Sequence, residues 1–594
     1  IIMYISGHLK HSKLKLRYPI FLLTLFLALY TPTIFSQSTE VLPKGLTEVE
    51  KQLLSEYQFS RSETGPPPTG PVRTMAEWEE VEYLVLTWQP NFPNILTQIV
   101  AAAVNECKVI ITTQNQNSVS SLLTSSGVDL TNVSFIDVPW NSIWIRDYGG
   151  NTIYSDDVGE RGMVDWIYNR PRPADDVMPL QHANFTSTPF YTTDSGTADL
   201  VNTGGNFMSD GLGNAFASEL ILNENAPGNP YGVTPKTEAE IDQIMEDYMG
   251  IETYIKMAPL PFDVINHIDM HLKLLDEETL LVSQYPEGVA DGPQIEANIN
   301  YVLNNFQSPF GTPYKIKWIP APPSSGGNYP DNGGYYRNYT NSIFINKTIL
   351  LPLYRPEVDA AALAQWEEMM PGYNIVGIDV DNPGENLISL VGAIHCITHT
   401  IGVEEPLWIV HQPVPFADAN TTVPIDAMIK HISGINQAKV FWREVGAANY
   451  NETPMTLVSG DDWTADLVFG TDPVAVEYYI WAEATSGKSL TRPIVAPEGY
   501  WTINTEILSV EDNVANKISA LFPNPTNGNV FVNLTNAGTV NIEIFNVLGQ
   551  QLAFQTVANV NGTIELPLQD DWKGVLLITF SGEFGSVTKK VIKH

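Results

Sequence analysis

The sequence predicts a chain of several domains, and its largest part, residues 76 to about 402, is predicted to be an α/β domain. Strand-like apolar runs at 83–88 and 108–113 flank a segment of helical periodicity at 94–105. The same alternation recurs along the chain. Further strands are predicted at 133–138, 279–283 and 343–346, and helices at 238–249 and 294–306. Polar residues at the strand ends mark candidate functional positions.

Chain length and net charge indicate the number of domains and the kinds of partner to expect. The 594 residues are too many for one core and predict about three or four domains. The formal net charge is -36, from 67 acidic and 31 basic residues. Because phosphate binding relies on clustered lysine and arginine, this charge argues against a nucleic-acid partner. It would attract cationic ligands, although acidity spread along a chain usually serves solubility.

The first 36 residues have the order of a secretory signal peptide. Four basic residues precede an apolar run at 18–30, and a short polar stretch follows. We expect cleavage near Ser36 and Gln37, with a retained anchor as the alternative. Residues 37–75 end in a Gly-Pro-rich stretch and are predicted to form an extended segment ahead of the core.

Beyond residue 402 the pattern changes to short strands. Residues 439–443, 456–458 and 474–482 alternate apolar and polar side chains between turn residues, which predicts a β-sandwich over 403–505. Residues 516–594 have a third pattern and are predicted to be a separate domain.

Cys396 is the first candidate for chemistry, because it is one of only two cysteines and lies in a glycine-bounded stretch, Gly392 to Gly402. A thiolate nucleophile needs an open turn and a proton partner, and His395 and His399 flank it. Two alternatives stay open. Cys396 could be a buried apolar residue, or it could form a disulfide with Cys107 in an exported chain.

Charged residues form two further candidate groups. Asp147, which precedes two glycines, could bind a guanidinium group, since a carboxylate matches a planar fork of N–H donors. The alternative is a local salt bridge to Arg146. Arg170 and Arg172, stiffened by prolines, could clamp a carboxylate. Their alternative is an ion-pair network with the acidic pair 175–176.

His267 and Asp269 form the last group. On an extended segment, residues two apart point to the same face, so this pair is predicted to project into one cavity as an acid/base and a binding carboxylate. A metal site that includes His271 is the rival interpretation. The Gly-, Asn- and Tyr-rich residues 324–341 are predicted to form a gate or a surface loop.

Taken in order, four motifs resemble those of the Porphyromonas-type peptidylarginine deiminases and the related agmatine deiminases. They are Trp144-Ile-Arg-Asp147, His267-Ile-Asp269, Tyr339-Thr-Asn341 and Gly392-Ala-Ile-His-Cys396. The resemblance implies a pseudo-fivefold α/β propeller with a central active site. It also implies that Cys396 is the nucleophile, that Asp147 and Asp269 hold the guanidinium, that His267 is the general acid/base and that Asn341 assists. No cofactor is then required, although acidic loops at 175–176 and 379–381 leave a structural calcium possible.

The substrate follows from a smaller part of the same resemblance. The stretch with Arg170 and Arg172 looks like the one with which the secreted branch holds the α-carboxylate of a C-terminal arginine. Trp144 is a further expected substrate contact. We therefore expect conversion of peptidyl-arginine, C-terminal arginine first, to citrulline and ammonia through a covalent thiouronium. An agmatine or free-arginine deiminase, a Cys-His-Asp hydrolase and a non-catalytic surface-binding protein are the alternatives.

The two later domains also resemble known modules. Residues 403–505 resemble the immunoglobulin-like β-sandwich that follows secreted deiminases. Residues 516–594, with Leu521-Phe-Pro-Asn-Pro and a basic end, resemble the small β-sandwich that the type IX secretion pathway of Bacteroidota uses for sorting. The resemblance implies interaction with that secretion machinery. It also implies a protein that is secreted or attached to the outer-membrane surface.

Overall fold

The computed structural model describes residues 41–54, 56–59, 66–194, 196–506, 518, 521–546, 550–569, 571–582 and 585–594. The predicted signal peptide and its cleavage position lie outside these residues. Within them, no helix has both the length and the apolar character needed to cross a membrane.

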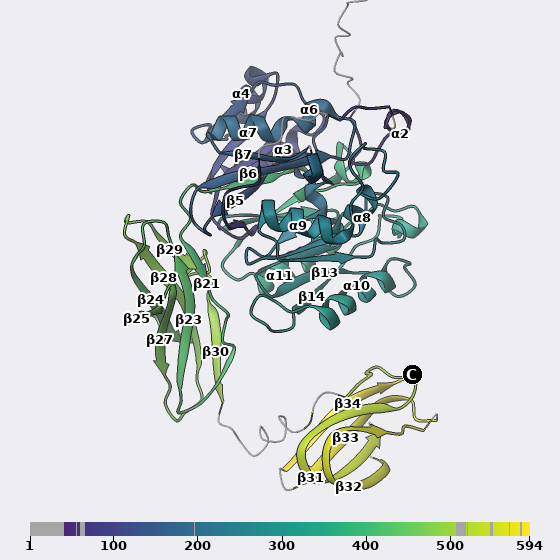
Figure 1. The fold of residues 1–594 in the computed structure, drawn as a ribbon. Coiled ribbons are helices and arrows are strands. Elements are labelled where there is room, and N and C mark those ends of the chain that lie inside the picture. Colours follow the sequence, from purple (N-terminus) through teal and green to yellow (C-terminus); the bar gives the residue numbers. More distant parts are fainter. Residues whose placement is uncertain are drawn as a thin grey trace, which may run out of the picture.

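Residues 72–402 form an α/β domain whose described strands gather into five small sheets (Figure 1). The first contains β1 (Val72–Thr74), β5 (Asn151–Ser155), β6 (Arg161–Tyr168), β7 (Phe190–Thr193) and β8 (Val201–Asn202). The second contains β9 (Met208–Ser209), β10 (Asn214–Ser218) and β11 (Thr253–Met257). The third contains β12 (Leu272–Leu274), β13 (Thr279–Gln284) and β14 (Lys315–Pro320).

The remaining sheets complete this domain. The fourth contains β15 (Ile343–Ile345), β16 (Thr348–Leu353) and β17 (Asn374–Asp379). The fifth contains β20 (His399–Gly402), β2 (Val81–Thr87), β3 (Lys108–Thr112) and β4 (Val133–Ile136). A two-stranded ribbon joins β18 (Asp381–Asn382) to β19 (Glu385–Asn386). Because β20 pairs with β2, the end of the domain closes onto its beginning.

Each of the five sheets repeats one arrangement, an antiparallel strand pair followed by a parallel pair. Examples are β12 with β13 and β13 with β14, and β15 with β16 and β16 with β17. A parallel pair requires a crossover connection, and helices occupy these connections. The longer helices are α3 (Pro93–Ala103), α4 (Gln116–Ser125), α7 (Met178–Thr186), α9 (Glu238–Met249), α10 (Gly292–Asn305) and α11 (Pro356–Met369). The shorter ones are α5 (Ile145–Tyr148), α6 (Pro173–Asp176) and α8 (Leu220–Glu224).

The predicted α/β alternation is confirmed. The helices expected at 94–105, 238–249 and 294–306 correspond to α3, α9 and α10, and the expected strands overlap β2, β3, β4, β13 and β15 with ends that differ by one or two residues. Helix α9 begins where Thr237 and Glu240 form a capping box, and it ends at Gly250 in a left-handed conformation, φ 65°. These caps explain why its bounds were predictable.

The expectation of an extended segment at 37–75 is wrong for much of its described part. Residues 48–53 form a helix, α2 (Glu48–Leu53), which Thr47 and Glu50 cap reciprocally. Leu54 and Phe59 are buried in an apolar cluster with residues 167, 201, 231 and 233 of the α/β domain. Strand β1 pairs with β5. The polar composition concealed this, because only a few apolar side chains fix the segment.

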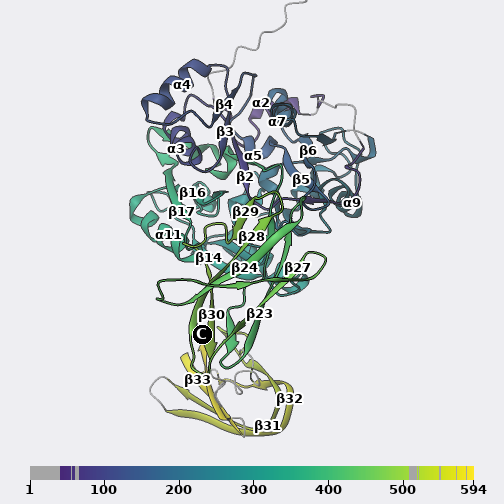
Figure 2. The ribbon, with the colours of Figure 1, turned by 90° about the vertical axis from the view of Figure 1, so that its left-hand side faces the viewer.

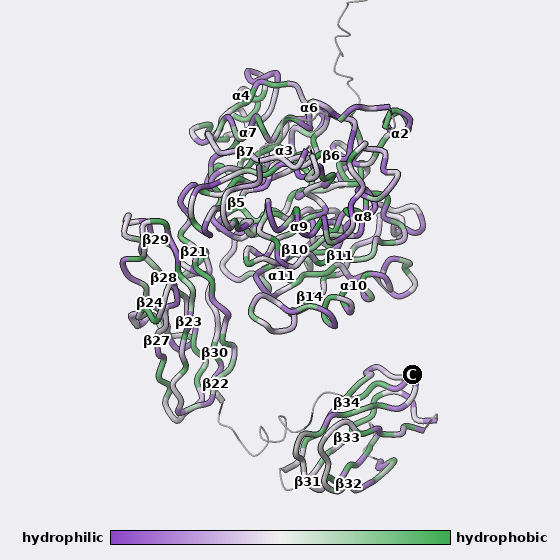
Figure 3. Tube along the Cα trace, in the orientation of Figure 1, coloured by the Kyte–Doolittle hydropathy of each residue, from purple (hydrophilic) through white to green (hydrophobic). Residues whose placement is uncertain are grey.

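Residues 403–506 form a second domain of two packed sheets. One contains β21 (Trp408–Val410), β23 (Thr422–Lys430), β27 (Asp462–Val468) and β26 (Thr456–Ser459). The other contains β22 (Phe416–Asp418), β30 (Trp501–Glu506), β28 (Ala475–Ala484), β24 (Ile435–Glu444), β25 (Asn451–Pro454) and β29 (Ser489–Arg492). Apolar and polar residues alternate along these strands (Figure 3), and their inward faces make one core. Arg492 pairs with Glu277 of the α/β domain, at 2.9 Å.

The described C-terminal residues form a four-stranded antiparallel sheet, where we expected a small sandwich of two sheets. Its strands are β31 (Val530–Asn546), β32 (Gln551–Leu566), β33 (Gly574–Gly582) and β34 (Gly585–Lys593). The pairing of β31 with β32 is irregular around Gly538. Such irregularities increase local bending, which lets one long sheet enclose its own apolar core.

Candidate active site

Cys396 lies at the centre of a fully buried group of polar side chains. Its Sγ atom is 3.0 Å from Lys44 Nζ, 3.3 Å from Asn341 Nδ2 and 3.6 Å from Asp269 Oδ2. Each of these four side chains is at most 1% exposed. Both cysteines are free, so the disulfide alternative is not formed here.

Short, tightly turned elements position these groups. Asp147 is on α5, which lies near the middle of the α/β domain with longer helices toward the rim (Figure 2). Asp269 belongs to a 3₁₀ turn, η3 (Ile268–Met270), and Cys396 to another, η6 (His395–Ile397). Val391, just ahead of the cysteine loop, has φ 66°, a strained value for a β-branched residue. The packing around the loop therefore imposes its shape.

His267 and Asp269 do enter one site, but by a different geometry from the one expected. We predicted an extended segment, whereas residues 268–270 form the 3₁₀ turn η3. His267 Nδ1 lies 3.4 Å from Asp147 Oδ1, while Asp269 faces Lys44 and Cys396. The expected pairing is reached because a single tight turn also brings residues two apart near each other. His271 is buried, and within the described residues it belongs to no group of His, Cys, Asp or Glu side chains that could hold a metal ion.

Two carboxylates and one ammonium group dominate the charge of the site. Lys44 Nζ is 3.4 Å from Asp269 Oδ1 and 3.8 Å from Asp147 Oδ1. Burial alone would raise the pKa of Asp269, but the charges of Lys44 and His395 hold that pKa far below its usual range. The pKa of Asp147 is likewise lowered by Lys44 and His267 against the effect of burial. Both aspartates are therefore ionised and favour a cation between them.

The Cys396 thiol is protonated in this arrangement. Burial, followed by the negative charge of Asp269, raises its pKa to about 12, and Lys44 only partly offsets this. Burial lowers the pKa of His267, which favours its neutral form, while Asp147 opposes this shift. A nucleophilic thiolate would therefore require a further positive charge near Sγ, together with a proton acceptor.

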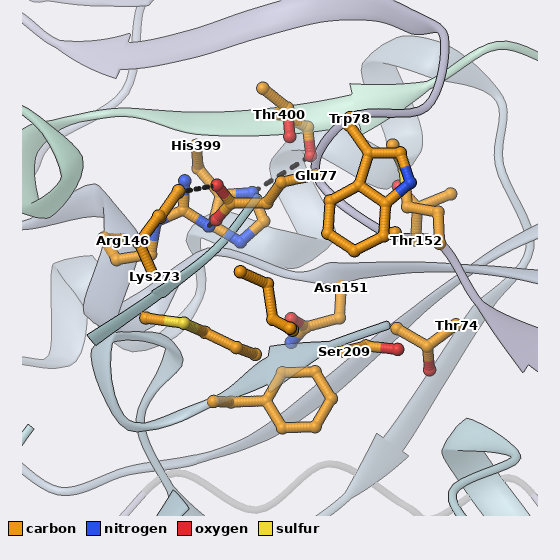
Figure 4. Close-up of a pocket in the computed structure, with 15 residues that line it drawn as sticks. Thr74, Glu77, Trp78, Arg146, Asn151, Thr152, Ser209, Lys273, His399 and Thr400 are labelled. Atoms are coloured by element: carbon orange, nitrogen blue, oxygen red, sulfur yellow. Dashed lines mark hydrogen bonds and ion pairs between the residues drawn. The ribbon is translucent and has the colours of Figure 1, made fainter. Parts of the chain in front are cut away.

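A second layer of charged residues supports Asp269 from behind. His395 Nδ1 is 2.9 Å from Asp269 Oδ2, and its Nε2 is 2.6 Å from Glu77 Oε1. Glu77 also pairs with Arg146 and Lys273. Glu77, Arg146 and Lys273 lie at one end of a cavity of about 50 Å³, with Trp78 and Thr74 toward the other (Figure 4). This network fixes the orientation of Asp269 toward the cysteine.

The predicted carboxylate-binding arginines contact the N-terminal residues. Arg170 Nε donates to the Lys44 carbonyl oxygen at 3.2 Å. Arg172 Nη2 donates to the Pro43 carbonyl at 2.8 Å, and its Nε pairs with Glu50 at 2.8 Å. Trp144, the other predicted substrate contact, donates from Nε1 to the Leu42 carbonyl at 3.0 Å. All three predicted binding residues are thus engaged by the chain around Lys44.

Glycine is required at two positions of the site. A Cβ atom on Gly205 would lie 2.4 Å from His267 Nδ1 and 2.8 Å from Asp147 Oδ1. A Cβ atom on Gly392 would lie 2.3 Å from the Trp144 indole ring. Both contacts are too short for any side chain, so the two glycines allow the backbone to close around the candidate site.

Sequence reasoning missed Lys44 and Glu77 and did not assign a role to His395 beyond flanking the cysteine. Lys44 sits in a polar segment that showed no periodicity, and Glu77 is one of several acidic residues in a row. Only the adjacency of His395 to Cys396 was a usable signal. The other two positions follow from tertiary packing.

No metal ligand set is found in the described chain, because no group of three or more His, Cys, Asp or Glu residues there is arranged to hold an ion. The acidic pair 175–176 accepts hydrogen bonds from Ser142 and from the Tyr168 amide. Asp381 pairs with Arg337 at 2.7 Å. These contacts give the acidic loops protein partners, and structural calcium there stays a prediction.

Buried carboxyl groups predict a pH-dependent stability. Burial raises the pKa of Asp175 and Asp263 to about 6 and of Asp176 and Asp210 to about 7. A raised pKa stabilises the fold fully below the unfolded-state value of about 3.9, and this stabilisation is lost as pH rises through the folded-state value. Buried His182, His271 and His411, whose pKa burial lowers to about 4, act in the opposite direction over the same pH range. Asp210→Asn isolates the contribution of one carboxyl group, because the amide is neutral at every pH. We expect calorimetry to show that this variant gains unfolding temperature relative to wild type at pH 8 but not at pH 5, and an equal difference at the two pH values would contradict the expectation.

Comparison with known families identifies the α/β domain. The family model for Porphyromonas-type peptidyl-arginine deiminase matches residues 73–401, more than half of the chain. The chain belongs to this family. The Porphyromonas-type deiminases act on guanidino groups, so the predicted deiminase resemblance is confirmed at the level of the family.

Similar proteins include agmatine deiminases. The chain is 27% identical over 300 residues to a protein of Yersinia pseudotuberculosis provisionally named an agmatine deiminase, covering 46% of this chain and 77% of that protein. A protein of Vibrio parahaemolyticus with the same provisional name is 24% identical over 370 residues, covering 55% and 95%. The solved agmatine deiminase of Enterococcus faecalis is 19% identical, with a TM-score of 0.45, and the match covers 57% of this chain and 99% of that one.

The C-terminal prediction is also confirmed. The model for the secretion system C-terminal sorting domain matches residues 520–594. This Porphyromonas-type deiminase therefore carries the type IX signal for export, to the cell surface or the medium.

Proposed function

We propose that this protein is a cysteine-dependent deiminase that converts peptidyl-arginine to peptidyl-citrulline and ammonia. The observation that carries the proposal is the environment of Asp147. In the described chain neither of its buried carboxylate oxygens accepts a well-aligned hydrogen bond, and the nearest charged groups, His267 Nδ1 and Lys44 Nζ, lie 3.4 and 3.8 Å from Oδ1. A buried acceptor without a donor is costly, and the N–H groups of a guanidinium would supply the missing donors.

The position of the bound cation matches the proposed chemistry. Lys44 Nζ shows where a positive charge is held, between Asp147 and Asp269 and 3.0 Å from Cys396 Sγ. A guanidinium at this point would place its carbon within reach of the sulfur. Reacting atoms about 3 to 3.5 Å apart are in a near-attack arrangement.

The proposed reaction proceeds through a covalent intermediate. The thiol proton passes to His267, whose Nε2 has no hydrogen-bond partner in the described residues, and Sγ bonds to the guanidinium carbon. His267 then returns the proton to the departing nitrogen, and ammonia leaves an S-alkylthiouronium. Water adds to that carbon, the C–S bond breaks, and the products are the ureido group and the thiol. The substrate cation promotes ionisation of a thiol that burial and the two aspartates otherwise keep protonated.

Arg170 supports a preference for C-terminal arginine. Its Nε donates to the carbonyl oxygen of residue 44, the residue whose side chain occupies the site. In a peptide that ended at this residue, that oxygen would belong to the α-carboxylate. A charged acceptor would strengthen the hydrogen bond, and agmatine has no group to offer there.

Internal arginine is the second candidate substrate, and the path of the N-terminal residues through the site supports it. Residues 41–47 pass through the site with backbone on both sides of Lys44, and Arg172 donates to the carbonyls of Pro43 and Gly45. The site therefore accommodates a continuous peptide.

A substrate panel tests the proposal. We would measure the ureido product from a peptide ending in arginine, the same peptide with internal arginine, and agmatine, using wild type and the Lys44→Ala variant. We expect the C-terminal peptide to be preferred. In Arg170→Gln, its KM should rise by about tenfold or more, because a hydrogen bond to a charged group is lost, while agmatine turnover stays unchanged.

The outcomes separate the alternatives. An equal loss of activity toward both peptides in Arg170→Gln would indicate that Arg170 binds a backbone carbonyl oxygen rather than the α-carboxylate. Preference for agmatine would overturn the peptide assignment. If neither wild type nor Lys44→Ala forms a ureido product from any of the substrates, a surface-binding protein with a deiminase fold is favoured.

The proposal extends to the fold classes of the α/β domain and of the two-sheet domain. We assign the five repeated sheets to the five modules of a pseudo-fivefold propeller whose centre holds Cys396. We assign the two-sheet domain at 403–506 to the immunoglobulin-like class. Its role would be support, since Trp408 stacks under the Arg73 guanidinium at 3.8 Å and anchors it to the α/β domain.

A further inference from the structure

The N-terminal strap, residues 41–54 and 56–59, blocks the proposed active site. Lys44, Cys396, His267, Asp147 and Asp269 are each at most 1% exposed. The side chain that fills the space in front of the sulfur comes from the strap itself. A substrate can reach Cys396 only after Lys44 has left.

The lysine side chain matches arginine atom by atom as far as the reacting centre. Counting from Cα, Nζ of lysine is the fifth side-chain atom, and the fifth in arginine is Cζ, the carbon that would be attacked. Lys44 Nζ lies 3.4 and 3.8 Å from the two carboxylate oxygens. Guanidinium nitrogens extend about 1.33 Å from that carbon in three directions, so both carboxylates lie within reach of its N–H groups. The site therefore suits a guanidinium better than the ammonium that occupies it.

The backbone of the strap is held at the site in the way a peptide would be. The Lys44 amide donates to the Leu390 carbonyl at 3.0 Å, and its carbonyl accepts from Arg170 at 3.2 Å. Trp144 binds the Leu42 carbonyl. The proposed substrate-binding residues thus recognise the strap.

A separate anchor holds the strap outside the pocket. Glu50 forms both a capping box with Thr47 and an ion pair with Arg172. Leu54 and Phe59 pack into an apolar cluster on the α/β domain. Because the anchor is covalently joined to Lys44, it keeps a high effective concentration of the blocking residue at the site.

We propose that the strap is a built-in competitive inhibitor in which Lys44 imitates the substrate arginine and its release switches the enzyme on. The contacts alone support the inference that the strap blocks access to Cys396. The inference that this inhibition is competitive rests on the proposed function. An ammonium carries no electrophilic carbon, so Lys44 binds without reacting. Arginine peptides would have to displace the strap or find it already removed.

Alkylation of Cys396 by iodoacetamide tests access without requiring deiminase activity. We expect Lys44→Ala, in the full chain, to raise the alkylation rate by about tenfold or more relative to wild type. Removing Lys44 also removes a charge that lowers the pKa of the thiol, which by itself would slow alkylation. An increase can therefore arise only from access. Cys107, also buried and with its pKa raised to about 12, is an internal reference for unfolding.

Two further variants complete the test. Lys51→Ala removes an exposed lysine of the same strap and should leave alkylation at the wild-type rate. Glu50→Gln weakens the anchor by removing the charge that pairs with Arg172, and it should raise the rate, which covers the case in which Lys44→Ala fails to fold. Unchanged alkylation in both Lys44→Ala and Glu50→Gln would overturn the proposal.

Activity measured in parallel separates this proposal from the proposed function. Faster alkylation with more ureido product supports both. Faster alkylation without product from any guanidine supports the blocking strap and rejects the deiminase assignment. If Lys44→Ala and Glu50→Gln are alkylated at the wild-type rate and the wild-type chain is fully active, the blocking role of the strap is rejected and the deiminase assignment is retained.

Discussion

Replacing Cys396 by alanine is expected to lower ureido product formation by about 10⁴-fold or more, in both the wild-type and the Lys44→Ala chain. In the proposed reaction the sulfur forms the covalent intermediate, and the described site offers no second nucleophile at its position, since the groups nearest to Sγ are an amide, a carboxylate and an ammonium. The loss should appear in kcat, because the two aspartates still bind the guanidinium. A colorimetric assay for the ureido group measures it.

Cys107→Ala is the matched control for this prediction. Cys107 is also buried and free, but it lies beside Leu84 in the first part of the domain, away from the charged site. We expect this variant to keep activity within a few fold of the parent chain. Activity that survived in Cys396→Ala and disappeared in Cys107→Ala would reverse the assignment of the nucleophile.

The residues that converge on the site were predictable where local chemistry marks them. Cys396 follows Gly392 and Asp147 precedes Gly149, and an added Cβ atom would lie 2.3 Å from Trp144 at the first position and 2.5 Å from His399 at the second. Their order along the chain carried the family resemblance. The distances between them were beyond sequence reasoning, because they depend on how five sheets pack.

The roles of Lys44 and Glu77 could not be predicted from the local sequence. A buried lysine is expected to be paired, but no feature of residues 37–75 indicates that one of their few basic side chains is buried at all. Its partners, Asp147 and Asp269, are more than a hundred residues away. Glu77 similarly gains its role from His395, at the far end of the domain. Such pairings exist only in the folded chain.

The charge of the site also changes how the predicted histidine is understood. From sequence we expected His267 to act as the general acid/base beside the cysteine. In the structure the cation beside Sγ is Lys44, and burial lowers the pKa of His267. A neutral imidazole is suited to accept the thiol proton once a guanidinium replaces the ammonium. The acid/base role remains a proposal, with the substrate supplying the charge.

Lys44→Arg is expected to turn the inhibitor into a substrate. The substitution would place an electrophilic carbon where Nζ now lies, 3.0 Å from Cys396 Sγ and between the two carboxylates. We expect residue 44 of the purified variant to be citrulline, with no substrate added. Peptide mass spectrometry reads this directly, since water is added and ammonia lost at that one side chain. A chain stalled before hydrolysis would instead show residue 44 linked covalently to Cys396.

The controls for this variant lie in the same strap. In Lys51→Arg the new guanidinium is exposed and should stay unmodified, and in Lys44→Arg combined with Cys396→Ala residue 44 should remain arginine. An unmodified arginine at position 44 in a chain that deiminates added peptide would show that the strap does not hold residue 44 in the substrate register. Self-conversion would explain the native choice of lysine. Of the two long cationic side chains, only lysine can fill this site without being consumed by the reaction that the site performs.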